Sequence, residues 1–540
     1  MTQNARHPFP VFILLVFFIT NGYGQGQLNG SLVTRTQFFI RDSAIGAIGT
    51  PQYDRQLYGA ESWLALNYSN WGFQFALRMD WFQNSNLFDP QGSYSGQGIG
   101  RWYVRKKIDF LDIQAGYIYD QIGSGILFRA YEDRTLGIDN ALAGIHLTAD
   151  LPHDWRVKAF TGRQKNRFDL YESNLKGLAL EGYQSDEKWS WSPGLAIVNK
   201  TLADVQMNSL VANLNTYDAD YQFVPKYNAY GLSTYHSLGF GNWSVFTELA
   251  YKTRDVQIES TGTYRNAAGD EVPAPFFIQK PGHVWYSSLN YGNAGLGFSL
   301  EYKQTRFFSF RTAPNATLNQ GMINYLPPMT RQNTYRLTTL YVAATQEAGE
   351  DALQGEVFWS WSDPWRWSLQ GSLIDLPDGT KMYREIFSEL QFQDLTRHLT
   401  LGVQHQQYNK DRYEGKPGEP MVKAYTAFAE FFKQADDTHS WRFEAQYQYS
   451  QHGYGSWIYG LAEYGIAPKW LFSASNMYNY RKPDGSAGEN YYALSTSFQQ
   501  NGQRLMLSYV RQVEGVVCSG GICRYEPAFN GFRINLWATF

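Results

Sequence analysis

The 540-residue sequence has few charged residues, and it has no long apolar run after its first twenty residues. Charged residues make up 18% of the chain, whereas soluble domains carry about 25%. The formal net charge of −3 gives no basic excess, so nucleic acid is not expected as a partner. A spanning helix needs ~20 consecutive apolar residues, and mean hydropathy is only −0.43. These shortages exclude a bundle of transmembrane helices.

The amino terminus has the features of an export signal. Arg6 and His7 precede a short apolar run over residues 11–19, and Gly22-Tyr23-Gly24 follows it. A basic start, a short apolar stretch and small residues are typical of a cleaved signal peptide. The apolar run is too short for a membrane anchor. We therefore predict a signal peptide over residues 1–24 and an exported single domain over residues 25–540.

Only two cysteines are present, Cys518 and Cys523, and the segment Ser-Gly-Gly-Ile separates them. In an exported protein, two cysteines that face each other across a tight turn most simply form a disulfide. A metal site would need further ligands, which the neighbouring sequence does not offer. A free redox-active pair is the remaining alternative.

Aromatic residues, by contrast, are abundant at 17%, and they alternate with polar residues along many segments. Phe73–Trp81, Leu296–Lys303 and Trp441–Tyr449 are clear cases. Period-two alternation indicates strands with one apolar face and one polar face. Opposite charges recur on the polar faces, as expected inside a transmembrane barrel. The predicted lumen-facing residues are Arg78, Asp80, Glu248, Lys252, Glu301, Lys303, Arg442 and Glu444. Because both signs are interspersed along the sequence, we do not predict strong ion selectivity.

The chain ends in one more such strand, Gly531–Phe540, with an aromatic residue at its carboxyl terminus. This ending resembles the closing strand of bacterial outer-membrane β-barrels. In those proteins the terminal aromatic residue is part of what the assembly machinery reads, which assigns that role to Phe540. The resemblance implies an all-β fold, a transmembrane antiparallel barrel, located in the outer membrane.

Connections between the predicted strands alternate between short and long, which is the pattern of periplasmic turns and external loops. The predicted external loops are the stretches 43–56, 88–98, 202–224, 257–282 and 311–331. Strand counts made from the two ends of the chain disagree by one strand within 333–363. We therefore expect Thr334–Trp361 to form one long strand, or part of it to fold into the lumen. Both termini should face the periplasm, so the number is even; about 24 strands are expected, with a range of 22–26.

The segment Gly123–Asn140 does not alternate, and it begins with a Gly-Ser-Gly hinge. One interpretation is a loop folded into the barrel, where its charges shape a constriction. The other, which we prefer, is an external loop held by its own salt bridges. The charged residues concerned are Arg129, Glu132, Asp133, Arg134 and Asp139.

This segment, the stretch from Cys518 to Ala528 and the closing strand together resemble an uncharacterised outer-membrane β-barrel family of the Bacteroidota type. The resemblance runs over most of the mature chain. It implies the location and the barrel architecture. It implies no activity and no functional residues.

Enzymatic signals are weak. The histidines form no His-x-His or His-Glu-x-x-His motif, and no nucleophile is accompanied by a suitable base. We predict no enzyme, no catalytic, metal or cofactor-binding residue, and no cofactor. The first predicted strand follows the cleavage site at once, which disfavours a receptor that carries an amino-terminal plug.

The leading hypothesis is an outer-membrane channel or transporter for small solutes. The main alternative is a non-conducting barrel that acts as a scaffold or secretion partner through its external loops; an outer-membrane hydrolase is a minor alternative. The expected partners are outer-membrane lipid and the barrel assembly machinery, with an unidentified periplasmic or surface protein also open. The sequence does not identify the substrate or the oligomeric state.

The cysteine pair gives a first test. Native protein should resist alkylation by iodoacetamide in denaturant, and reduction should then allow exactly two alkyl groups to add, measured by intact mass. Two thiols that react without reduction would contradict the disulfide.

Overall fold

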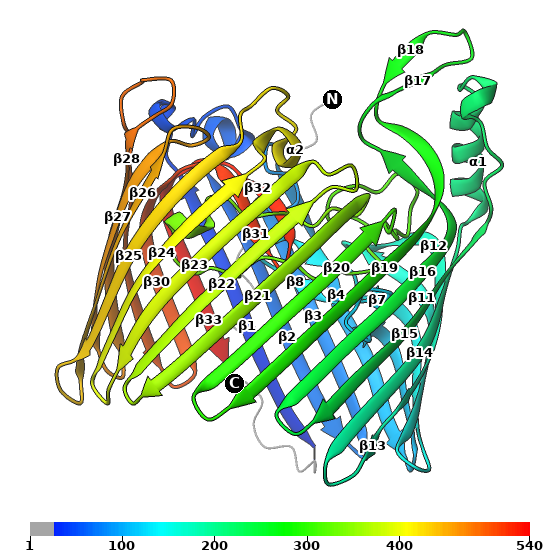
Figure 1. The fold of residues 1–540 in the computed structure, drawn as a ribbon, viewed down its shortest axis with the longest axis horizontal. Coiled ribbons are helices and arrows are strands. Elements are labelled where there is room, and N and C mark those ends of the chain that lie inside the picture. Colours follow the sequence, from blue (N-terminus) through cyan, green and yellow to red (C-terminus); the bar gives the residue numbers. More distant parts are fainter. Residues whose placement is uncertain (1–25) are drawn as a thin grey trace, which may run out of the picture.

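A computed structural model describes residues 26–540, so the predicted signal peptide lies outside the described residues. The chain forms one 25-stranded antiparallel sheet in which the short β13 (Gln184–Ser185) continues β12. That leaves 24 wall strands. The first wall strand, β1 (Gln27–Phe39), pairs with the last, β33 (Phe529–Thr539), and this pairing closes the sheet into a barrel (Figure 1). The predicted fold class and the expected strand number are confirmed.

The other wall strands pair with their neighbours in chain order. In the first half they are β2 (Tyr58–Asn70), β3 (Phe73–Ser85), β4 (Tyr94–Ile108), β5 (Leu111–Ile118), β10 (Leu142–Leu151), β11 (Trp155–Asn166), β12 (Asp169–Gly182), β14 (Trp189–Thr201), β15 (Asn228–Phe240), β16 (Trp243–Glu259) and β19 (Phe276–Asn293). In the second half they are β20 (Leu296–Arg306), β21 (Gly349–Ser362), β22 (Trp365–Asp375), β23 (Lys381–Gln393), β24 (Arg397–Tyr408), β25 (Val422–Gln434), β26 (His439–Ser450), β27 (Ser456–Ile466), β28 (Trp470–Arg481), β29 (Asn490–Gln500) and β30 (Gln503–Gln512).

The closing seam depends on the alternation of β33. Phe532, Ile534 and Leu536 face outward beside the outward residues of β1, and Phe38 pairs with Phe532. Phe540 continues the ladder, because its backbone N–H donates to Gly30 O at 3.0 Å and its carbonyl accepts from Gly30 N at 2.8 Å. The terminal aromatic residue is therefore part of the wall.

The two ends of the barrel differ. One end, here called the terminal end, holds the start of β1, the end of β33 and short turns (Figure 1). In one of these turns the Asp394 carboxylate accepts from the backbone N–H groups of Thr396 and Arg397. The hydrogen bond from the Arg397 guanidinium lowers the pKa of Asp394 to about 2. The opposite end, the loop end, carries the longer connections.

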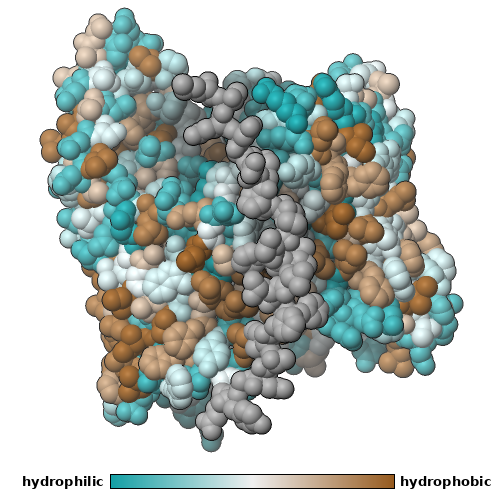
Figure 2. All heavy atoms as spheres, turned by 180° about the vertical axis from the view of Figure 1, so that it is seen from behind, coloured by the Kyte–Doolittle hydropathy of each residue, from teal (hydrophilic) through white to brown (hydrophobic). Residues whose placement is uncertain are grey.

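The outer face of the wall is apolar. Leu249, Ile386 and Val403 are each at least half exposed there, and Figure 2 shows apolar side chains over much of the wall. Aromatic side chains gather next to the turns of the terminal end, where Trp361 stacks on Trp365 and Trp243 packs on Tyr291. An apolar band with aromatic residues at its edge is the surface that a lipid bilayer requires. The fold is that of an outer-membrane β-barrel.

On one side of the loop end the wall continues upward as a tower (Figure 1). The tower consists of the upper parts of β16 and β19, the hairpin of β17 (Thr263–Arg265) and β18 (Glu271–Pro273), and the helix α1 (Asp204–Leu214). Leu210, Leu214, Tyr217 and Val256 form its small core.

The remaining helical pieces are short: α2 (Lys410–Glu414), η2 (Ser43–Ile45), η3 (Gln52–Gln56), η4 (Ala219–Tyr221) and η5 (Leu337–Thr339). Within residues 26–540 there is no helix of sufficient length and apolarity to cross a membrane.

The lipid-facing assignment of the wall can be tested by charge insertion. Leu249→Arg, in the middle of an outward face, should destabilise the barrel in lipid vesicles by about 2–4 kcal/mol. Asn67→Arg, at an exposed inward position of β2, should change the free energy of unfolding far less. Urea titration monitored by tryptophan fluorescence measures both, and equal costs would contradict the assignment.

Candidate functional site: three inward segments in the lumen

The connection between β20 and β21, residues 307–348, crosses the inside of the barrel; it is called the strap below. Its residues Phe308, Phe310 and Ile323 are fully buried. The prediction of an external loop over 311–331 is therefore wrong. Of the two alternatives for Thr334–Trp361, one long strand is wrong and partial folding into the lumen is confirmed, because β21 begins only at Gly349 and the residues before it belong to the strap. The disagreement in the predicted strand count arises from residues 333–348, which belong to the strap and form no wall strand.

Three inward lysines of the wall hold the strap by its backbone. Lys200 donates to the carbonyl of Arg311 at 2.9 Å, and Lys252 donates to the carbonyl of Ser309 at 2.5 Å. Lys303 donates to the carbonyl of Pro327. All three lysines are at most 1% exposed. Carbonyl groups buried without a donor are costly, so these contacts allow an irregular backbone to cross the lumen.

Two acidic residues pair with the same three lysines. Asp255 lies 2.7 Å from Lys200 and 3.6 Å from Lys252, and Glu350 lies 2.7 Å from Lys303. Lys252 and Lys303 were predicted to face the lumen, and the structure places both there. Lys200, Asp255 and Glu350 were not singled out. The apolar run Phe307-Phe308-Ser309-Phe310 was the available signal that a buried segment follows β20.

On the opposite wall the strap is held by glutamines. Gln446 Oε1 accepts from Leu337 N at 2.7 Å, and Gln448 Nε2 donates to Leu337 O at 2.8 Å. Gln406 Nε2 donates to Tyr341 O at 3.1 Å. The strap therefore makes contact with both sides of the barrel.

A second inward segment, residues 119–141, is called the inner loop. Arg78 is 3% exposed and reaches it from β3: its guanidinium contacts Glu132 at 2.8 Å and Asp139 at 3.0 Å, and also Asp80 at 2.7 Å. Lys165 forms a further ion pair with Asp139. The preferred interpretation of this segment as an external loop is wrong, because wall residues hold it inside the barrel.

The other predicted residues of the inner loop also make local contacts. Arg134 pairs with Glu132 at 2.9 Å, and Asp133 accepts from the backbone N–H of Thr135. The Arg129 guanidinium lies over the rings of Tyr131 and Tyr325, the latter in the strap. Glu248, fully buried on β16, accepts from Ser124 N at 2.8 Å and Ser124 Oγ at 2.7 Å. Most charged side chains of the inner loop thus form contacts that keep the loop inside the barrel.

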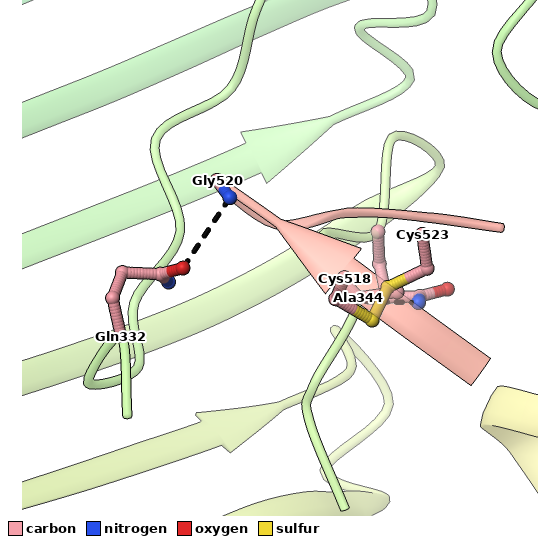
Figure 3. Close-up of a disulfide and its surroundings, with 6 residues drawn as sticks. Gln332, Ala344, Cys518, Gly520 and Cys523 are labelled. Atoms are coloured by element: carbon pink, nitrogen blue, oxygen red, sulfur yellow. Dashed lines mark hydrogen bonds between the residues drawn. A yellow bond between two sulfur atoms is a disulfide. The ribbon is translucent and has the colours of Figure 1, made fainter. Parts of the chain in front are cut away.

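The third inward segment is the hairpin of β31 (Gly515–Ser519) and β32 (Ile522–Glu526), which contains the Cys518–Cys523 disulfide. Its tip meets the strap: Gly520 N donates to Gln332 Oε1 at 3.3 Å, and Thr345 N donates to Gly521 O (Figure 3). Arg524 Nε donates to Thr135 O in the inner loop at 2.7 Å. The disulfide therefore lies in the hairpin at which the three inward segments meet.

Towards the terminal end, several inward charged side chains are exposed to solvent instead of buried. The side chains of Arg105, Lys107 and Arg156 are 48%, 60% and 53% exposed. The predicted residues Glu301 and Arg442 also face this region: Glu301 accepts from Tyr286 at 2.9 Å, and Arg442 pairs with Glu444 at 2.8 Å. This water-accessible half of the lumen is called the vestibule.

Negative and positive side chains of the inner wall lie mainly on different sets of strands. On β20–β27 carboxylates outnumber cationic groups: Glu301, Glu350, Glu356, Glu385, Glu389, Glu430, Glu444 and Glu463 against Lys303, Arg366 and Arg442. On β30, β33, β1–β5 and β10–β12 cationic groups outnumber carboxylates: Arg35, Arg78, Arg101, Arg105, Lys107, Arg156, Lys158, Arg504 and Arg533 against Glu61, Asp80, Asp112, Asp150 and Glu181. The two signs are interspersed along the sequence but unevenly distributed around the lumen.

A family model described as "Family of unknown function (DUF6029)" matches residues 7–367 and 374–540. No curated protein matches the chain.

Several solved barrels are similar in outline. The P pilus usher (PapC) translocation pore is 10% identical, with 95% of this chain and 99% of that chain covered and a TM-score of 0.43. The ferric-catecholate import receptor Fiu from E. coli K12 is 8% identical, with 95% and 81% covered and a TM-score of 0.43. A BenF-like porin from Pseudomonas fluorescens Pf-5 is 9% identical, with 81% and 97% covered and a TM-score of 0.34. At these scores the architecture rests on the strand pairing of this chain alone.

The lysine anchors predict a large stability difference between buried and exposed ion pairs. Lys303→Met removes the cationic partner of the Glu350 carboxylate, which keeps only the hydrogen bond from Gln346 N, and the donor of the Pro327 carbonyl; it should cost about 3–5 kcal/mol of unfolding free energy. Lys107→Met removes an exposed pair with Asp150 and should change the free energy of unfolding far less, because water screens that pair. Urea denaturation in detergent measures both, and equal costs would show that the strap does not depend on its buried anchors.

Proposed function

We propose that this chain, which belongs to the family of unknown function DUF6029, is a gated outer-membrane channel for small solutes. The observation that carries the proposal is the contrast between the two halves of the lumen. Three inward segments meet in the loop-end half, whereas the vestibule exposes charged side chains to water. A solvent-exposed vestibule that ends where the strap, the inner loop and the disulfide-bonded hairpin meet has the form of a closed channel.

The uneven charges favour small polar solutes. A solute in the vestibule would lie between a wall rich in carboxylates and a wall rich in guanidinium and ammonium groups. Such a transverse field orients dipolar molecules. Zwitterionic or otherwise dipolar solutes are therefore the substrate class that we propose, and no catalytic step is invoked.

The proposed location follows from the wall and the termini. The signal peptide at residues 1–24 would direct export, and the barrel assembly machinery would read the closing strand with Phe540. The terminal end would then face the periplasm and the tower would face outward. Lipid would cover the apolar wall, as it covers other barrels of this kind.

One observation favours a second function, a scaffold for a surface or secretion partner. Val205, Val211 and Val224 are 73%, 39% and 83% exposed on or beside the tower. Exposed apolar residues on a projecting element suit contact with another protein. In that case the barrel need not conduct.

Deletion of the strap tests the proposal. Arg306 and Gly349 pair across β20 and β21, so an Asn-Gly turn can replace residues 307–348. In planar bilayers we expect the native barrel to be mostly closed with occasional discrete openings, and the deletion variant to conduct steadily. We expect this difference in conductance because the strap crosses the lumen of the native barrel and is absent from the variant.

A matched control removes a segment of the same end. Glu259 and Phe276 also pair, so the same turn can replace residues 260–275 of the tower; this variant should behave like the native barrel. A native barrel with a large steady conductance would contradict closure by the strap. A native barrel that never opens would favour the scaffold.

A further inference from the structure

A cleft lies at the loop end between the wall and the strap. It has a volume of about 520 Å³ and is lined by the segment 166–169, where β11 turns into β12, by Tyr94 at the start of β4, and by Asn315 and Gln320 of the strap. Arg167, Asn315 and Gln320 are exposed, so the cleft is accessible from the loop end. It is called the mouth cleft, and it lies at the opposite end of the barrel from the vestibule.

Both sides of the mouth cleft are held in place. On the wall side, the ring of Phe168 lies so close to β4 that a Cβ added at Gly98 would come within 2.9 Å of it. On the strap side, the Arg311 guanidinium donates to the Gln320 carbonyl at 2.7 Å and pairs with Glu347 at 2.9 Å. A site whose side chains are already fixed loses less entropy when a ligand binds. The mouth cleft is therefore pre-organised for binding.

Two charged side chains of the mouth cleft have no counter-charge in the protein. Within residues 26–540, Arg167 forms no ion pair and no side-chain hydrogen bond; its guanidinium lies over the rings of Phe88 and Tyr94 at 5.1 Å and 4.6 Å. The carboxylate of Asp169 likewise has no ion pair or hydrogen bond to any residue of that range. By contrast, carboxylates of the inner loop pair with cations of the wall. The mouth cleft thus offers one positive and one negative group to a ligand.

These groups match a molecule that carries both charges. A guanidinium binds a carboxylate through two parallel hydrogen bonds, and a carboxylate binds an ammonium group through charge-assisted ones. The side-chain amides of Asn166, Asn315 and Gln320 also have no hydrogen-bond partner among the described residues, and each can both donate and accept. Peptide groups need one donor and one acceptor in the same way. A saccharide could use the amides, but it would leave both charges without a counter-charge.

The size and the aromatic rings of the mouth cleft suit a short peptide. Sites of about 300–1,000 Å³ hold molecules of drug size, so a single small amino acid would fill only part of the cleft. The rings of Tyr94, Phe168 and Tyr171 border it and can pack against an apolar side chain. A peptide of two or three residues supplies both charges, peptide groups and such a side chain.

We propose that the mouth cleft binds zwitterionic peptides of two or three residues, with Arg167 at the carboxylate end and Asp169 at the ammonium end. The inference rests on the proposed function for the dipolar class of solute, and it narrows that class to short peptides. Because Asn315 and Gln320 belong to the strap, a bound peptide contacts the segment that crosses the lumen. Binding needs no conductance, so it is measured independently of whether the barrel is a channel.

Isothermal titration calorimetry of the full barrel in detergent tests the proposal, with the tripeptide Ala-Phe-Ala as the probe. We expect one saturable site for the peptide with free ends. Acetylation of its amino terminus removes the ammonium charge, and amidation of its carboxyl terminus removes the carboxylate charge. Each modification should weaken binding by at least about tenfold, because one charge-assisted contact is lost.

Two variants with matched controls assign the two ends of the peptide. Arg167→Asn places a residue that tolerates the left-handed backbone, where φ is 59°; it should bind the free and the amidated peptide equally, while acetylation still weakens binding. Asp169→Asn should bind the free and the acetylated peptide equally, and it decides the question should Arg167→Asn fail to fold. Arg163→Gln and Glu172→Gln are the controls, because these two residues pair at 2.9 Å on the same strands outside the mouth cleft; both should keep the native preferences.

Several results would overturn the peptide site. They are the absence of saturable binding by the native barrel, equal binding of the free, acetylated and amidated peptides, or variants that keep the native preferences. Saturable binding of maltose in place of the peptide would overturn it in favour of a saccharide site. Peptide binding by a barrel that never conducts would contradict the channel and support the site, whereas conductance without peptide binding would overturn the site alone.

Discussion

The structure depends on one requirement: a backbone that enters the interior of the barrel must find hydrogen-bond donors and acceptors there. A wall of 24 strands encloses more space than its own side chains fill. The strap occupies part of this space, and Lys200, Lys252 and Lys303 donate to its carbonyl groups. Two buried carboxylates face the three lysines: Asp255 is shared by Lys200 and Lys252, and Glu350 pairs with Lys303. Without these partners the carbonyl groups of the strap would be buried unpaired, and the strap would be more stable in water outside the lumen.

The same requirement explains why the inward segments meet. The inner loop is held by Arg78 and Glu248 on the wall, and the disulfide-bonded hairpin contacts the strap with its tip and the inner loop through Arg524. The contacts inside the lumen thus involve three connections that are distant in sequence.

The wall could be predicted from the sequence because period-two alternation is a local property. Phe73–Trp81 and Gly531–Phe540 show it without knowledge of any neighbour. The inward segments could not be predicted in this way, because an external loop and a lumen-filling loop have similar composition. Lys303 occupies the same place in the alternating pattern whether its ammonium group donates to water or to the carbonyl of Pro327. The charge separation around the lumen was hidden for a related reason: Arg78 and Asp80 alternate in sign along β3, whereas the imbalance arises only when distant strands are brought together.

The structure places residues 307–348 inside the barrel and holds them there by contacts with the wall. Hydrogen–deuterium exchange of the strap tests it most directly, since Phe310 N bonds to Asn324 Oδ1 and Ile323 N bonds to Phe310 O in the interior. Peptides covering 307–326 should be protected for as long as peptides from the wall strands. Exchange of these peptides within seconds would contradict this placement of the strap.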